Sequence, residues 1–251
     1  MAESLRESHA WRRLEWHHGE LAAETLRGLF AADSARGERM TAEAAGLYLD
    51  YSKHLVVDDT LSLLRRLATE RGLEEKTRAL FAGEHVNVSE DRPAMHVALR
   101  MPSSRSLVVD GVDVVREVHD ELARMAALAS SLRTRAVVNI GIGGSDLGPA
   151  MAYEALRAYA DPGLTVRFVS NVDPADLELA LSGLDPAETL VVVVSKTFTT
   201  LETMENARRV QAWLGDAGDN LVGVAASPEA GAKLGIPPER MLRMWDWVGG
   251  R

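Results

Sequence analysis

Two polar stretches directly follow apolar runs of the kind that form buried strands, and both contain residue types that bind phosphate. The upstream stretch, 141–149, contains four glycines together with Ser145 and Asp146. The downstream stretch contains four hydroxyls and a cation: Ser195, Lys196, Thr197, Thr199 and Thr200. Backbone N–H groups at a helix N-terminus, hydroxyls and a lysine can together surround the oxygens of one phosphate group. The sequence therefore predicts a site for a phosphorylated ligand.

The glycine stretch has two other interpretations, a nucleotide site and a plain turn. The dinucleotide fingerprint G-x-G-x-x-G requires a glycine where this chain has Asp146, and the next apolar run, 166–170, lacks the acidic residue that holds a ribose. The stretch 195–197 also lacks the glycine loop of a Walker A motif. A nucleotide-binding enzyme is therefore the weakest hypothesis. A tight strand-to-helix turn stays open, because glycine commonly marks turns.

The hydroxyl stretch also has a purely structural interpretation for one of its members. Thr199 and Glu202 have the spacing of a capping box, which predicts that Thr199 caps a helix running to about Leu214. One cap does not need four hydroxyls. Ser195, Thr197 and Thr200 are therefore the candidates for ligand binding.

Other kinds of chemistry find little support. The chain has no cysteine, which excludes disulfides and thiolate chemistry, and no serine lies in a G-x-S-x-G elbow. His17, His18 and Glu20 lack the ligand spacing of a metal motif and fit a solvated helix face, whereas His96, in an apolar run, is expected to be buried. A net charge of −9 argues against nucleic acid or an anionic membrane as the main partner. Without a secretory signal or a spanning apolar run, a soluble cytoplasmic protein is expected.

The pattern along the chain changes after residue 134. Four short β-branched runs, 136–140, 166–170, 190–194 and 221–225, alternate with helical segments that begin at Asp173-Pro174, near Thr199 and at Ser227-Pro228. A further strand is expected within 241–247. This alternation predicts an α/β fold, a doubly wound parallel sheet of about five strands. Residues 135–251 are expected to form this α/β part.

Residues 1–134 are expected to form a mostly helical N-terminal region. Apolar spacing predicts helices over 11–30, 58–71, 74–81 and 112–132, with short strands at 46–51 and 94–99.

Four stretches together resemble the glucose-6-phosphate isomerase family. They are 138–149 (VNIGIGGSDLGP), 168–173 (FVSNVD), 195–203 (SKTFTTLET) and 247–251 (WVGGR), and they occur in family order. Weaker similarity covers 50–55, 83–87 and 96–100. The resemblance implies a sugar-isomerase-type (SIS) fold with two α/β subdomains, of which only the first is present here.

The resemblance also implies a reaction and its site residues. Family members interconvert glucose 6-phosphate and fructose 6-phosphate without a cofactor or metal, usually as homodimers. By this resemblance the phosphate is held by Ser145, Ser195, Thr197 and Thr200. Gly144, Lys196 and Gly250 line the site. Arg251 matches the arginine that stabilises the enediolate.

The chemistry requires more than these residues supply. Moving a proton between C1 and C2 through a cis-enediol needs a general base. The family's base glutamate and its ring-opening histidine and lysine come after the position that matches Arg251. We therefore expect an N-terminal half that is inactive alone. The alternative is a stand-alone regulatory module of the SIS type that binds sugar phosphates. If the chain is a half, we expect an exposed apolar face near the last strand, where the second subdomain would pack.

Overall fold

The structure, a computed structural model, describes residues 4–249, with the side chains of 216–218 left aside. The chain divides into two compact units, Met1–Ala79 and Leu80–Arg251. Residues 80–134 therefore group with the sheet that follows them, whereas the sequence boundary at 134/135 marks the change in secondary-structure pattern. None of the described helices is long and apolar enough to cross a membrane.

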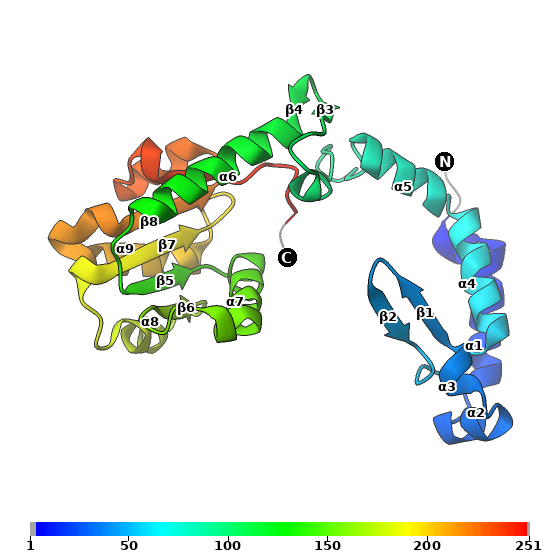
Figure 1. The fold of residues 1–251 in the computed structure, drawn as a ribbon. Helices are drawn as coiled ribbons and strands as arrows, with labels where there is room; N and C mark the ends of the chain where they lie inside the picture. The colour runs from blue at the N-terminus through cyan, green and yellow to red at the C-terminus, as the bar shows by residue number, and fades with distance from the viewer. Residues whose placement is uncertain (1–3, 250–251) are drawn as a thin grey trace. The chain divides into compact units, whose positions relative to one another are not determined.

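The first unit is mostly helical and contains one β-hairpin (Figure 1). Its elements are η1 (Leu5–Glu7), α1 (His9–Leu21), α2 (Leu26–Ala32), α3 (Arg36–Arg39), β1 (Thr41–Ala44), β2 (Leu47–Asp50), α4 (Asp58–Glu70) and the start of α5 (Leu73–Ala82). The single helix expected over 11–30 is wrong, because the Thr25 hydroxyl accepts from the Gly28 N–H at 3.1 Å and caps a separate helix, α2.

A buried arginine holds this unit together locally. Arg36 is only 2% exposed. Its guanidinium donates to the carbonyls of Ser52, His54 and Val56 at 2.7–2.9 Å. The planar fork of donors thus fixes the loop between β2 and α4.

The second unit is built on a five-stranded parallel sheet with helices packed against it (Figure 1). Its strands and longer helices are β3 (Val108–Val109), β4 (Val112–Asp113), α6 (Val114–Ser131), β5 (Ala136–Ile140), α7 (Gly144–Leu156), β6 (Thr165–Val169), α8 (Pro174–Leu181), β7 (Thr189–Val194), α9 (Leu201–Leu214), β8 (Leu221–Ala225) and β9 (Met241–Arg243). Its 3-10 turns are η2 (Ala98–Arg100), η3 (Arg157–Tyr159), η4 (Pro186–Glu188), η5 (Gly215–Asn220), η6 (Pro228–Leu234) and η7 (Pro238–Arg240).

The sheet confirms the expected α/β class. Its strands follow the order β6-β5-β7-β8-β9, all parallel. The order reverses between β5 and β7, which are neighbours although β6 lies between them in sequence. Ligands of open α/β sheets bind beyond the carboxyl ends of the strands at such a switch point. The core on this sheet is aliphatic, and includes Val138, Ile140, Val191 and Val193, all fully buried.

The strand expected over 94–99 is wrong. The structure has irregular backbone there, followed by the η2 turn. Met95 and Ala98 are fully buried in a second apolar cluster with Trp245 and Trp247. The apolar run therefore reflects burial against the C-terminal segment and carries no strand periodicity.

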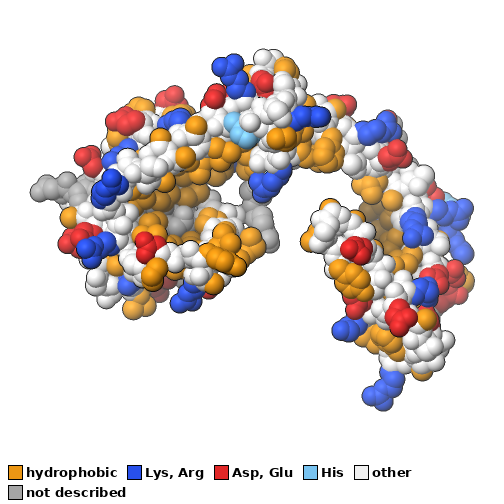
Figure 2. Space-filling model, viewed as in Figure 1, with side chains coloured by type: hydrophobic (Ala, Val, Ile, Leu, Met, Phe, Trp, Pro, Cys, Tyr) orange, Lys and Arg blue, Asp and Glu red, His pale blue; other side chains and the backbone are white. Residues whose placement is uncertain are grey.

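Exposed apolar side chains of the second unit gather on α7, where Figure 2 shows a hydrophobic patch. Leu147, Met151 and Leu156 are 54%, 69% and 60% exposed. On β9, the strand beside which such a face was expected, Met241 is buried and Leu242 half-buried. The apolar face thus lies on α7 rather than on the last strand itself.

Candidate functional site

The glycine stretch forms a tight turn between β5 and α7. Gly143 has a φ of 59°, and α7 begins at the next residue. A Cβ on Gly141 would lie 2.8 Å from the backbone oxygen of Ser145, so only glycine fits there. The buried Asn139 donates to the same oxygen at 3.0 Å. These contacts place Ser145, with Gly144 before it, in the first turn of α7 at the carboxyl end of β5.

The hydroxyl stretch forms the loop between β7 and α9. The Ser195 N–H donates to Val224 O at 3.1 Å, and Lys196 O accepts from the Ala226 N–H at 2.8 Å, so β8 holds the start of the loop. Phe198 takes a φ of 52° and buries its ring to 3% exposure. The apolar side chain therefore anchors a loop whose other members are polar.

The loop's hydroxyls pair with one another. Ser195 Oγ donates to Thr200 Oγ1 at 3.3 Å, and the hydroxyls of Thr197 and Thr199 lie 2.6 Å apart. Ser195 is buried, Thr200 is half-buried, and Thr197 is exposed. Hydroxyls that hydrogen-bond one another can turn to an incoming anion, because each is both donor and acceptor.

The expectation that Thr199 caps the following helix is wrong. The residue before α9 is Thr200, and its side chain makes no capping bond. The first N–H groups of α9 therefore have no side-chain cap from that position, which leaves them available to an anion at this helix N-terminus.

The two loops follow neighbouring strands at the switch point of the sheet. Ile140, the last residue of β5, pairs with Val193 of β7. The Gly144–Ser145 turn and the 195–200 loop therefore leave the same edge of the sheet side by side. The structure thus brings Gly144, Ser145, Ser195, Thr197 and Thr200 to one edge, as the motif spacing predicts, whereas Gly250 and Arg251 lie outside the described residues.

One carboxyl lies in the first turn of α7. Burial raises the pKa of Asp146, the nearby Asp176 carboxylate adds to the rise, and the Ser170 hydroxyl opposes it. An anion bound at this turn is expected to raise the pKa of Asp146 further, because like charges disfavour ionisation.

Lys196 does not point into open space. Its ammonium donates to the carbonyl oxygens of Asp246 and Val248 at 2.7 and 2.9 Å. His96, expected to be buried, is exposed, and its Nε2 accepts from the Gly249 N–H at 3.1 Å. Sequence reasoning missed all three contacts, which join residues 50 or more positions apart and leave no local pattern.

The segment after β9 carries two stacked indoles. The ring centroids of Trp245 and Trp247 lie 4.9 Å apart, and the angle between the ring planes is 15°. Glu117 of α6 accepts from Trp245 Nε1 and from Arg243 Nη1, both at 2.8 Å. The expected last strand is thus shorter than 241–247, because the chain leaves β9 after Arg243 to form this turn.

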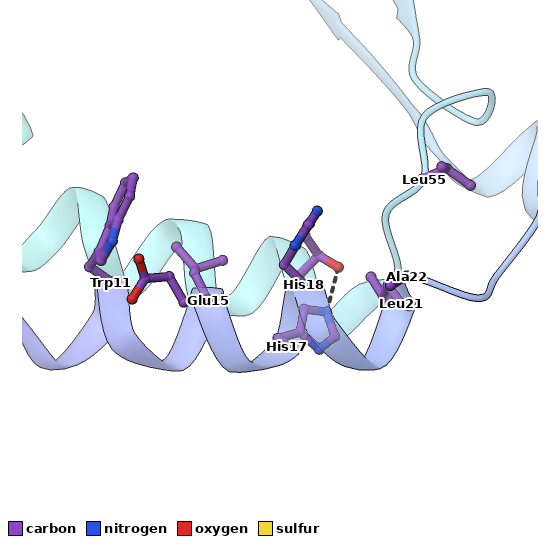
Figure 3. A pocket seen from close by; sticks show the side chains of 9 residues that line it. Trp11, Glu15, His17, His18, Leu21, Ala22 and Leu55 are labelled. Carbon is purple, nitrogen blue, oxygen red and sulfur yellow. Dashed lines mark hydrogen bonds between the residues drawn. The ribbon is translucent and has the colours of Figure 1, made fainter. Parts of the chain in front are cut away.

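An apolar groove in the first unit contains none of the motif residues. It has a volume of about 670 Å³ and is lined mainly by α1, with Leu55 and Thr60 (Figure 3). There His17 Nε2 lies 2.7 Å from Thr60 Oγ1, and its Nδ1 lies 3.5 Å from Glu20. The described residues contain no group of three or more metal-ligating side chains.

Known proteins match this chain over a range that includes both loops of the candidate site. The model of the phosphoglucose isomerase family matches residues 50–251. The glucose-6-phosphate isomerase of Deinococcus deserti is 53% identical over 269 residues, covering 100% of this chain and 49% of that protein. That of Roseiflexus castenholzii is 53% identical over 259 residues, covering 96% and 48%.

A solved structure agrees in fold. The crystal structure of a glucose-6-phosphate isomerase from Chlamydia trachomatis superposes with a TM-score of 0.81 at 25% identity, covering 99% of this chain and 50% of that one. The chain spans about half the length of the relatives it matches. These matches, together with the two loops at the switch point of the sheet, show that the chain belongs to the phosphoglucose isomerase family.

Proposed function

We propose that this chain is the N-terminal half of a glucose-6-phosphate isomerase and carries the phosphate-binding half of the site. The observation that carries the proposal is the pair of loops at the carboxyl ends of β5 and β7, in a chain about half as long as its relatives. Residues 1–134 are then the N-terminal region and 135–251 the first SIS subdomain.

In this proposal the phosphate monoester of the sugar lies between the two loops. Ser145, Ser195, Thr197 and Thr200 donate to its oxygens, and the N-terminus of α9 adds backbone N–H groups. Gly144, Lys196 and Gly250 line the site. Arg251 stabilises the negative charge that develops on the enediolate oxygen.

The chain supplies no residue that matches the family's base, so we propose that it does not turn over substrate alone. The exposed side chains of Leu147 and Met151 on α7 support a missing partner segment, because large apolar surfaces mark interaction sites. The full-length protein is proposed to be a cytoplasmic homodimer that acts on sugar phosphates and binds neither nucleic acid nor membranes.

Two assays test this function. The purified chain is titrated with fructose 6-phosphate, and separately assayed for isomerisation alone and mixed with the C-terminal half of the Deinococcus deserti enzyme. We expect binding that S195A weakens, no turnover alone, and turnover in the mixture. Turnover by the chain alone would contradict inactivity. Binding without turnover in the mixture would favour the regulatory module.

A further inference from the structure

The C-terminal turn Trp245–Val248 is held from two sides by residues far away in sequence. Within the turn, the Val248 N–H donates to Trp245 O at 3.0 Å. On one side Lys196 Nζ reaches the carbonyls of Asp246 and Val248. On the other, Met95 N–H donates to Trp247 O at 3.3 Å and Gly249 N–H donates to His96 Nε2 at 3.1 Å. Four contacts thus fix four consecutive residues.

The contacts of Lys196 are stronger than those of a surface lysine. An ammonium has three donors, and two of them are used on backbone oxygens at short distances. Hydrogen bonds from a charged donor are shorter and about twice as strong as neutral ones. The Lys196 backbone is itself fixed, because its carbonyl accepts from Ala226 N–H at 2.8 Å. Lys196 therefore links the hydroxyl loop to the turn through contacts at both its backbone and its ammonium group.

We propose that Lys196 is a positioning residue that couples the hydroxyl loop to the turn Trp245–Val248, with His96 as the second support of the same segment. This inference rests on the proposed function of the site, and it gives Lys196, which lines the site, the role of holding the turn in place of contact with the phosphate. The hydroxyls and N–H groups hold the phosphate, while Lys196 fixes the backbone of Asp246 and Val248, directly before Gly249. Arg251 follows two residues later in the sequence.

The first test observes the Lys196 ammonium group in the unmodified chain, and a substitution serves only to assign its signal. The chain has four lysines, so uniform ¹⁵N labelling gives few lysine ammonium signals beside the backbone amides, and comparison with K196R identifies the one from Lys196 by its loss. We expect this signal to be protected from water exchange and to stay unchanged when inorganic phosphate shifts the amide signals of Ser145 and Ser195. An ammonium signal that moves in step with those amides would overturn the inference. If no amide signal shifts, the proposed phosphate site is wrong. The hydrogen-exchange experiment below then still tests whether Lys196 positions the turn Trp245–Val248.

The second test measures amide hydrogen exchange of the 251-residue chain. In K196M we expect the amides of Val248 and Gly249 to exchange about tenfold faster, because two charge-assisted hydrogen bonds are lost. The matched control K233M removes the same charge from an exposed lysine and is expected to leave these amides unchanged. Unchanged exchange in K196M, with β5 still protected, would overturn the inference. If the amides of β5 also exchange faster in K196M, the variant has unfolded. The protection of the Lys196 ammonium signal in the unmodified chain then tests the positioning role.

Discussion

The hydroxyl oxygens of Thr197 and Thr199 lie 2.6 Å apart, so the two side chains bond to each other across the loop between β7 and α9. Thr199 therefore does not cap the helix, although its spacing to Glu202 is that of a capping box. The loop's hydroxyls hydrogen-bond one another, and the N-terminus of α9 has no side-chain cap from Thr200.

Thr199→Ala is expected to change the free energy of unfolding by less than about 0.5 kcal/mol, as for an exposed side chain outside a cap. Urea denaturation measures it. Asp173→Ala is the positive control, because Asp173 Oδ1 accepts from Ala175 N–H at 2.9 Å and caps α8. Loss of that cap is expected to cost about 1 kcal/mol. An equal loss in both variants would restore the capping role of Thr199.

Phe198→Ala is expected to lower the free energy of unfolding by about 3 kcal/mol, as for a buried aromatic ring. Because Phe198 holds its loop at a φ of 52°, the same change is expected to weaken phosphate binding. Denaturation and phosphate titration measure the two effects. Leu201→Ala is the matched control in the same region, since Leu201 is 73% exposed and is expected to change stability little. Phosphate affinity that survives F198A would show that the ring only fills the core.

Glycine-to-alanine changes at Gly141 and Gly148 are expected to have opposite signs. At Gly141 the new methyl would meet backbone atoms of Ser145 at 2.8–3.0 Å, so the turn must shift and Ser145 with it. Gly148 lies within α7 with open space around its Cβ position, and alanine there is expected to stabilise by about 0.5–1 kcal/mol. Thermal denaturation gives both signs, and phosphate titration is expected to show a loss only for G141A. A stabilised G141A would mean that the turn tolerates a side chain.

Sequence reasoning predicted the sheet well because its signals are local. The runs at 136–140 and 221–225 coincide with β5 and β8, since buried parallel strands are continuous β-branched segments. The same reasoning failed where tertiary contacts decide. The run at 94–99 is apolar because Met95 and Ala98 pack against Trp245 and Trp247. A contact of this kind leaves no periodic pattern in the sequence.

The site shows the same division. The glycine and hydroxyl stretches were found because strand ends and turn residues mark them in the sequence. The contacts of Lys196 with Asp246 and of His96 with Gly249 depend on how β7 and β9 are placed in the sheet, so only the folded chain reveals them.

His85 bridges two carboxylates and is expected to make stability depend on pH. Its Nδ1 lies 3.0 Å from Asp91 Oδ1 and its Nε2 lies 3.1 Å from Asp110 Oδ2, so both ring nitrogens face acceptors. The hydrogen bond with Asp91, then that with Asp110, raises the pKa of His85 above its ordinary value of 6.5. The imidazole ring thus links two aspartates whose φ values are 49° and 50°.

Because the folded pKa is the higher one, the contribution of His85 is complete below the unfolded pKa of about 6.5 and is lost as pH rises through the folded value. We expect the urea midpoint difference between the unmodified chain and H85Q to be larger at about pH 6 than at about pH 9. H9Q, at an exposed histidine, controls for the general effect of removing a titrating ring. The bridge is expected to need the charged ring, because only the protonated imidazole donates from both nitrogens. A midpoint difference that is constant with pH, or that grows as pH rises, would show that the bridge does not need a charged imidazole.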